Sequence, residues 1–295
     1  MARQLVSFDW AMKRILREKA NFNILEGFLS ELLKIDIKIE EILESEANQE
    51  DERNKFNRVD ILAKNESSEL ILIEVQHSSE IDYFHRMLYG TSKLISEHIS
   101  KGKGYKQVKK VYSVNIIYFD LGQGFDYLYY GKVDFKGLNR VDDSLKLSQN
   151  QIDEFKKREV YEIFPEYYII KVNKFNDIAK NSIDEWIYFL KNEEIEDNFK
   201  ARGLIEAKEK LDIMKLPKKE QLKYKKEAEN RMLELSLLDT AKIEGIKEGE
   251  KVGLKKGEKQ AKIEIAKKLL QQKIDLNIIT ISTGLTIEEI EEFKK

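Results

Sequence analysis

Two short apolar segments, each carrying an acid, constrain the fold of this chain more than any other feature. They are residues 58–63 (RVDILA) and residues 70–76 (LILIEVQ), rich in Val, Ile and Leu and separated by the polar turn KNESSE. Such runs are typical of β-strands, and a polar turn between them is typical of a hairpin. The sequence therefore predicts two adjacent antiparallel strands with Asp60 in the first and Glu74 in the second.

Strand geometry then predicts which side chains lie together. Successive side chains of a strand point to opposite faces, so Leu70, Leu72, Glu74 and Gln76 share one face. If the turn uses residues 65–69, Asp60 lies opposite Glu74, with Cβ atoms about 5 Å apart. Two acids within β-branched strands are costly to bury unless something neutralises them.

A divalent metal ion is the simplest means of neutralising this carboxylate pair. Mg²⁺ prefers oxygen ligands and takes carboxylates together with waters and phosphate oxygens. We therefore expect Asp60 and Glu74 to bind the metal and Gln76 to orient an attacking water. The alternative is that Asp60 pairs with Arg58 or another surface base, and Glu74 with Arg86 or a lysine.

The order of the expected elements indicates an α/β domain over residues 1–176. Apolar residues recur at helical spacing in residues 8–33 and 81–99. Further strands are expected at residues 35–39, 111–119, 125–135 and 158–172. These elements predict a sheet with helices around it.

Residues 177–295 form a second expected region, almost entirely helical and dominated by Glu, Lys, Leu and Ile. Glycine recurs there every four residues, at Gly245, Gly249, Gly253 and Gly257. Each glycine costs a helix about 1 kcal/mol relative to alanine. The repeat therefore indicates a weak helix, a close-packed helix pair or a solvated connecting helix.

The last 30 residues are expected to form three short helical pieces. Thr283-Gly284 breaks them, and Thr286 is the expected N-cap of the final piece. We favour a small dimerisation or docking tail, and hence homo-oligomerisation through the C-terminal helices. A helix–turn–helix reader of DNA is the alternative.

Composition excludes several classes of site. The chain has no cysteine, which rules out disulfides, thiolate zinc sites and cysteine nucleophiles and fits a reducing cytoplasm. Only three histidines are present, and no uncharged apolar run reaches the roughly 18 residues of a membrane span. The net charge of −2 does not exclude a nuclease, because a local basic patch is what matters.

The motifs together resemble the PD-(D/E)XK nuclease superfamily, and more narrowly the Rpn group of recombination-promoting nucleases and transposases. The resemblance covers nearly the whole chain. It rests on FDWAMKRIL, KFNRVDILA, ILIEVQ and FHRMLYGTSKL, on the glycine-repeat helix and on the terminal IAKKLL and STGLTIEEIEEF. It implies a restriction-endonuclease-like mixed sheet flanked by helices, and Mg²⁺-dependent cleavage of DNA linked to DNA mobility, with Mn²⁺ as a substitute metal.

Carried over by residue, the resemblance makes Asp60 and Glu74 the metal-binding acids. Gln76 stands where the superfamily signature has lysine, although glutamine is usual in the narrower group. Asp9 and Lys13 match the N-terminal motif. For Asp9 the resemblance suggests a place in the metal shell, and the alternative is capping of the first helix.

Basic side chains after the hairpin are the expected contacts to DNA. The run KGKGYKQVKK holds five lysines and no acid. Lys101, Lys103 and Lys106, together with Lys13 and Arg86, are candidate phosphate ligands for sequence-independent, salt-sensitive binding. The alternatives are a solubilising loop and, for Arg86, an ion pair with a core acid.

Two functions remain open from the sequence. The first is a Mg²⁺-dependent DNA endonuclease with Asp60, Glu74 and Gln76 as its catalytic residues. The second is a catalytically silent nuclease fold that acts as a DNA-binding or assembly module.

Overall fold

The computed structural model describes residues 5–43, 61–99 and 104–292. The chain divides into two compact units, Met1–Gln221 and Leu222–Lys295. The sequence predicts a domain boundary after residue 176. In the structure the boundary between the two compact units lies 45 residues later, after Gln221. Each unit is considered by itself.

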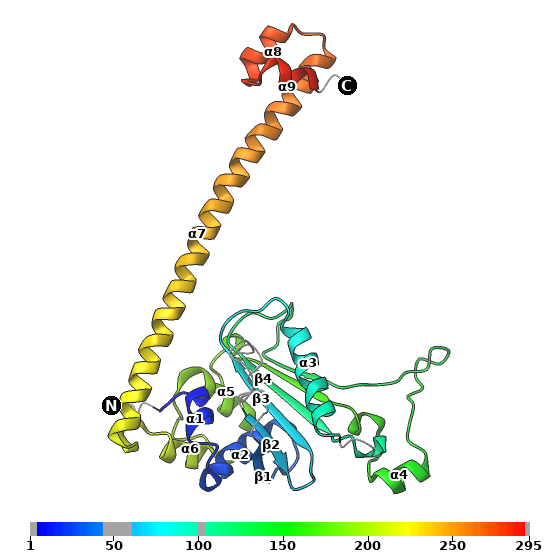
Figure 1. The fold of residues 1–295 in the computed structure, drawn as a ribbon, viewed down its shortest axis with the longest axis vertical. Coiled ribbons are helices and arrows are strands. Elements are labelled where there is room, and N and C mark those ends of the chain that lie inside the picture. Colours follow the sequence, from blue (N-terminus) through cyan, green and yellow to red (C-terminus); the bar gives the residue numbers. More distant parts are fainter. Residues whose placement is uncertain (1–4, 44–60, 100–103, 293–295) are drawn as a thin grey trace. The chain divides into compact units, whose positions relative to one another are not determined.

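A six-stranded mixed sheet forms the centre of the first unit, in the order β1-β2-β3-β4-β6-β5 (Figure 1). The strands are β1 (Ile39–Leu43), β2 (Ile61–Asn65), β3 (Leu70–Gln76), β4 (Val111–Ile117), β5 (Leu128–Gly131) and β6 (Glu166–Lys171). Strands β3, β4 and β6 run parallel, whereas β1, β2 and β5 join by antiparallel pairing. The structure confirms the predicted mixed sheet flanked by helices.

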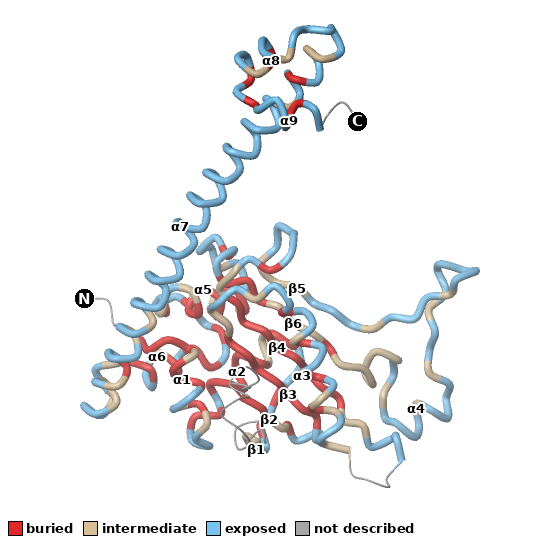
Figure 2. The backbone as a smooth tube through the Cα atoms, turned by 45° about the horizontal axis from the view of Figure 1, so that its top comes forward, coloured by how far each residue is buried: buried red, intermediate tan, exposed pale blue. Residues whose placement is uncertain are grey.

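Helices cover both faces of this sheet (Figures 1 and 2). Helix α3 (Tyr83–Glu97) packs on one face, where its Leu94 joins Leu62 and Leu72 in a buried cluster. On the other side gather α1 (Phe8–Arg14), α2 (Phe22–Leu33), α5 (Ser182–Asn192) and α6 (Leu204–Lys210). Every residue of β4 is buried, as expected for a parallel strand covered on both faces.

The helices beside α2 pack tightly through one glycine. A Cβ atom added to Gly27 of α2 would lie 2.3 Å from the carbonyl oxygen of Arg202, just before α6. Phe8 of α1 and Phe28 of α2 both pack edge-on against Trp186 of α5. The segment from α5 to α6 is therefore part of the core of the first unit.

Three expected strands have other bounds in the structure: the first is displaced to Ile39–Leu43, and the other two are shorter than the sequence pattern suggests. The backbone N–H of Ile37 donates to Ser30 Oγ, so the first strand begins only at Ile39. Residues 125–135 pair only over Leu128–Gly131, and the segment 158–172 pairs only from Glu166. The remaining turns and short helices are η1 (Lys19–Asn21), η4 (Tyr105–Gln107), α4 (Gln149–Phe155), η5 (Val160–Glu162), η6 (Val172–Lys174) and η7 (Ile213–Lys215).

Helices make up the second unit. Helix α7 (Lys218–Gln271), which starts in the first unit, is followed by α8 (Leu276–Thr283) and α9 (Ile287–Glu291). Ala266, Ile279 and Ile290 bury a small core between these three helices. Thr286 caps α9 as predicted, accepting from the N–H of Glu289 at 3.2 Å.

The repeated glycines of the long helix α7 have no close neighbours among the described residues. The four repeated glycines lie within α7, and a Cβ added to any of them meets no atom of the described residues within 4 Å. None of the helices in the described ranges is long and apolar enough to span a membrane.

Candidate active site

Glu74 and Gln76 lie near the end of β3, on the face of the sheet that α3 covers. Leu70 and Leu72 of the same strand pack with Leu94 of α3. Since alternate residues share a face, Glu74 and Gln76 continue this row toward the start of α3. In agreement with a shared face, Glu74 lies near Arg86 of α3, and Gln76 contacts Glu80, which pairs with the same arginine.

The carboxylate of Glu74 is buried, with 8% of the residue exposed, and it faces an arginine. Its Oε2 lies 3.7 Å from Nε of Arg86 in α3, and Nη1 of Arg86 lies 2.7 Å from Oε1 of Glu80. Burial acts to lower the pKa of Arg86, but the charges of Glu74 and Glu80 outweigh it and raise the pKa. Arg86 thus remains a cation between two carboxylates.

The amide of Gln76 is held by the loop that leads into α3. Its Nε2 donates to Oε1 of Glu80 at 2.7 Å and to the carbonyl oxygen of Ser78 at 3.3 Å. Both of these hydrogen bonds are donated by Nε2, so the amide oxygen Oε1 is the acceptor atom of the Gln76 side chain. The contacts of Nε2 leave the amide oxygen as an acceptor, and the role of Gln76 toward a water stays a prediction.

The strand next to β3 contributes a neutral polar group. Asn115 of β4 is paired in register with Glu74 and is 1% exposed. Its Oδ1 accepts from the hydroxyl of Tyr83 at 3.2 Å, and its Nδ2 donates to Ser113 Oγ at 3.0 Å. These bonds satisfy the buried amide and fix the edge of the site on the β4 side.

Strand β2, the antiparallel partner of β3, begins at Ile61, the residue after Asp60 in the sequence. The antiparallel pairing of β2 and β3 includes Ile61 opposite Ile73, the residues that adjoin Asp60 and Glu74 in the sequence. Asp60 itself lies outside the described residues. Among those that are described, no group of three or more His, Cys, Asp or Glu side chains is arranged to hold a metal ion.

Comparison with known proteins decides the family. A family model for the PD-(D/E)XK nuclease family transposase matches residues 6–241. The chain belongs to this family. No curated protein and no solved structure matches it. Membership in the PD-(D/E)XK family agrees with the mixed sheet and supports a nuclease-like function.

The N-terminal motif of this PD-(D/E)XK chain forms helix α1. Oδ1 of Asp9 lies 2.8 Å from Nζ of Lys13, one turn later. Ser7 is the N-cap, accepting from the N–H of Trp10 at 3.4 Å, so the capping alternative for Asp9 is wrong. Asp9 instead occupies the first turn, where the helix dipole favours a negative charge.

The basic run after α3 divides into parts with different roles. Lys101 and Lys103 lie outside the described residues. Lys106 is exposed and lies 3.0 Å from Glu154 of α4. Lys110, at the end of the run, is buried and bonds to Glu166 at 2.6 Å, so it is not part of a solvated loop.

Sequence reasoning missed two groups at the Glu74 cluster. Glu80 joins it through the loop after β3, and nothing in the local pattern marks this residue. Asn115 does leave a signal, since it is a polar interruption in the apolar run VYSVNIIYF. His77, next to Gln76 in the sequence, stacks on Tyr118 with ring centroids 4.3 Å apart.

Proposed function

We propose that this chain is a Mg²⁺-dependent DNA endonuclease that hydrolyses phosphodiester bonds and is linked to DNA recombination or mobility. Asp60 and Glu74 bind the metal, and Gln76 orients the attacking water. The observation that carries the proposal is the placement of Glu74 and Gln76 on one face of β3, beside the strand β2 whose first residue, Ile61, follows Asp60 in the sequence. The family match adds the expectation of DNA cleavage.

The residues present fit a hard divalent cation. Carboxylate oxygens from Glu74 and Asp60 are the donors that Mg²⁺ and Mn²⁺ prefer. When bound, such an ion would offset the negative charge of the scissile phosphate and lower the pKa of a water that it binds. Glu74 lies in β3, next to the fully buried β4, so the sheet fixes the position of its carboxylate.

Arg86 has two tasks in this proposal. In the structure its guanidinium contacts Glu74 and Glu80 and holds both carboxylates in place. Its remaining donors are suited to a phosphate oxygen, because a guanidinium presents five N–H groups in a fixed plane. Lys13, Lys101, Lys103 and Lys106 are the further phosphate ligands that we propose.

Binding through phosphates has a measurable consequence. Such contacts carry no base specificity, and they release counterions, so affinity falls steeply with salt concentration. We also propose that copies of the chain associate through the C-terminal helices, because α7 exposes Met232, Leu235 and Leu238. The cytoplasm remains our predicted location, on the absence of cysteine.

The test is cleavage of supercoiled and linear DNA with and without Mg²⁺. Wild-type protein is expected to nick plasmid DNA only with the metal, and Asp60→Ala and Glu74→Gln to reduce the rate by about 100-fold or more. Glu97→Gln, at the exposed end of α3, is the matched control and should cut normally. Normal nicking by folded Glu74→Gln protein would remove the site assignment.

One observation favours a second function. Arg86 contacts both Glu74 and Glu80, and Glu80 also accepts a hydrogen bond from Gln76, so these side chains form a bonded structural cluster in the chain itself. A catalytically silent DNA-binding or assembly module is the corresponding function. Calorimetry with Mn²⁺ and Mg²⁺ separates the two, because the silent module takes up no metal with or without DNA.

A further inference from the structure

A cavity of about 700 Å³ opens on the face of the sheet opposite to Glu74. Its polar wall carries four tyrosines from β4, β5, η5 and β6, namely Tyr112, Tyr130, Tyr161 and Tyr168. Volumes of this size are typical of sites for small ligands. Because these strand residues alternate with those that face α3, the cavity is separate from the candidate active site.

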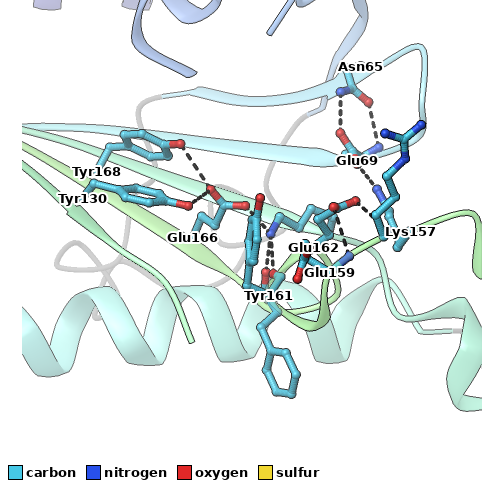
Figure 3. A network of polar contacts seen from close by, with 12 residues as sticks. Asn65, Glu69, Tyr130, Lys157, Glu159, Tyr161, Glu162, Glu166 and Tyr168 are labelled. Atoms are coloured by element: carbon cyan, nitrogen blue, oxygen red, sulfur yellow. Dashed lines mark hydrogen bonds and ion pairs between the residues drawn. The ribbon is translucent and has the colours of Figure 1, made fainter. Parts of the chain in front are cut away.

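A buried glutamate lies at the centre of this wall (Figure 3). The hydroxyls of Tyr130 and Tyr168 donate to Oε2 of Glu166 at 2.7 and 3.2 Å, and Nζ of Lys110 lies 2.6 Å from Oε1. Burial and the charge of Glu166 raise the pKa of both tyrosines, so they stay protonated donors at neutral pH. The carboxylate is therefore already neutralised and well bonded.

The positions that a cationic ligand would take are filled by the chain's own lysines. Nζ of Lys132 lies 3.9 Å above the ring of Tyr161. Nζ of Lys110 lies 5.3 Å from the ring centroid of Tyr112 and 5.8 Å from that of Tyr161. Since ammonium groups already face these rings, the cavity is not a cage for an organic cation.

What stays accessible in the cavity is flat and apolar. Tyr130 is 49% exposed and Ile35 is 44% exposed, and both line the cavity together with Leu33. The rings of Tyr130 and Tyr168 are 5.0 Å apart, which leaves no room for a third ring between them. A planar ligand therefore meets the outer face of Tyr130, with aliphatic side chains as the other wall.

Lys34 supplies a cation at the rim of the cavity. Lys157 is engaged with Glu69 at 2.6 Å, and Glu162 accepts from the backbone N–H of Glu159 at 3.2 Å. Lys34 has an exposed side chain whose ammonium is 3.9 Å from the nearest oxygen of Glu31, a distance too long for a strong contact. Lys34 can thus approach an anionic group on a ligand at the rim.

We propose that this cavity binds a nucleobase, with the base stacked on Tyr130 and its phosphate near Lys34. A planar heteroaromatic ring fits the accessible aromatic and aliphatic walls, and aromatic side chains hold bases of any sequence by stacking. The base can come from a free nucleotide or from an unpaired nucleotide of a strand. The proposal does not depend on nuclease activity, because the cavity shares no residue with the Glu74 cluster.

Calorimetry on the full chain tests this proposal, with EDTA present to prevent cleavage. The probes are adenosine 5′-monophosphate, adenosine, single-stranded oligo(dA) and the same strand in a duplex with oligo(dT). We expect Tyr130→Ala to weaken binding of the monophosphate or of the single strand by about ten-fold. Lys34→Ala should weaken the monophosphate and leave adenosine unchanged.

The arms of the experiment identify the source of the base. Tighter binding of the monophosphate than of the single strand indicates a free nucleotide, and the reverse indicates an unpaired strand. Tyr89→Ala, an exposed tyrosine of α3 on the other face, is the matched control and should bind like wild type. Glu74→Gln should also keep binding, which separates this site from the proposed nuclease site.

A second variant guards against misfolding. Ile35→Glu places a negative charge on the opposite wall and should abolish binding of the monophosphate, while circular dichroism verifies the fold of each variant. Absence of binding by every probe at millimolar concentration would overturn the proposal. Equal binding by wild type, Tyr130→Ala and Ile35→Glu would overturn it as well.

Discussion

Two polar clusters lie on opposite faces of the same sheet, and their charges are arranged differently. Beneath α3, the guanidinium of Arg86 contacts both Glu74 and Glu80. On the other face, Lys110 contacts Glu166 at 2.6 Å, and two tyrosine hydroxyls donate hydrogen bonds to the same carboxylate. The comparison teaches that the balanced buried pair of Lys110 and Glu166 suits structural support, whereas Arg86, shared by Glu74 and Glu80, holds two carboxylates beside the proposed metal site.

Removing one partner of the balanced pair is expected to have the largest effect on stability. Lys110→Met leaves Glu166 buried without its cation, and the free energy of unfolding should fall by about 3–5 kcal/mol. Urea unfolding measures this change. Lys106→Met, which breaks the exposed pair with Glu154, is the matched control and should cost about 1 kcal/mol or less. Equal losses in the two variants would break the contrast between the clusters.

On the α3 face the larger effect is expected on activity. Gln76→Leu removes the amide that accepts from water, and the plasmid nicking rate at saturating Mg²⁺ should fall by about 100-fold. The urea midpoint should change little, because Gln76 is only partly buried. Gln149→Leu, on exposed α4, serves as the control. A full nicking rate in Gln76→Leu would show that water is oriented by another group.

Replacing Arg86, the guanidinium that contacts both Glu74 and Glu80, by lysine should have a smaller effect on the nicking rate. In Arg86→Lys a single ammonium cannot contact Glu74 and Glu80 in the same plane, so the nicking rate should fall by about ten-fold. The measurement is the rate against wild type at equal metal concentration. Arg140→Lys, the same change at an exposed position, should leave the rate as it is. A rate unchanged in Arg86→Lys would mean that charge alone is required.

The smallest expected effect is an alkaline loss of stability on the tyrosine face. Burial and Glu166 raise the pKa of Tyr168 above its ordinary value of 10.0. The stability from this shift is complete below pH 10 and is lost as pH rises further, because the unfolded chain then releases the proton first. Urea midpoints at increasing pH should fall less steeply in Tyr168→Phe. An unchanged slope would argue against a proton held by this cluster.

The sequence predicts the bounds and the faces of an element best where a regular residue pattern ends at clear turn or capping residues. Residues 70–76 form β3 with the predicted bounds, and alternation places Glu74 and Gln76 on one face. Thr286 is an N-cap as predicted, since capping depends on residues three positions apart. These features are local, so short patterns contain the necessary information.

Contacts between distant segments could not be predicted in this way. Glu80 reaches Gln76 only because the loop after β3 turns back toward α3. In the sequence Lys110 is one of five lysines that could all be solvated. The strand register instead places it beside Glu166, which follows 56 residues later in the chain. The Ile35 and Ile37 alternation suggests a strand, yet a side chain of α2 takes the N–H of Ile37.

The packing of Trp186 has a consequence for synthesis of the chain on the ribosome. The sheet is complete once β6 has emerged, but the aromatic faces of Phe8 and Phe28 stay uncovered until α5 follows. A nascent chain that pauses before Ser182, or one truncated there by a stop codon, presents this aromatic surface to other proteins. Such a product is expected to be captured by chaperones or to aggregate, although every strand of the sheet has already been made.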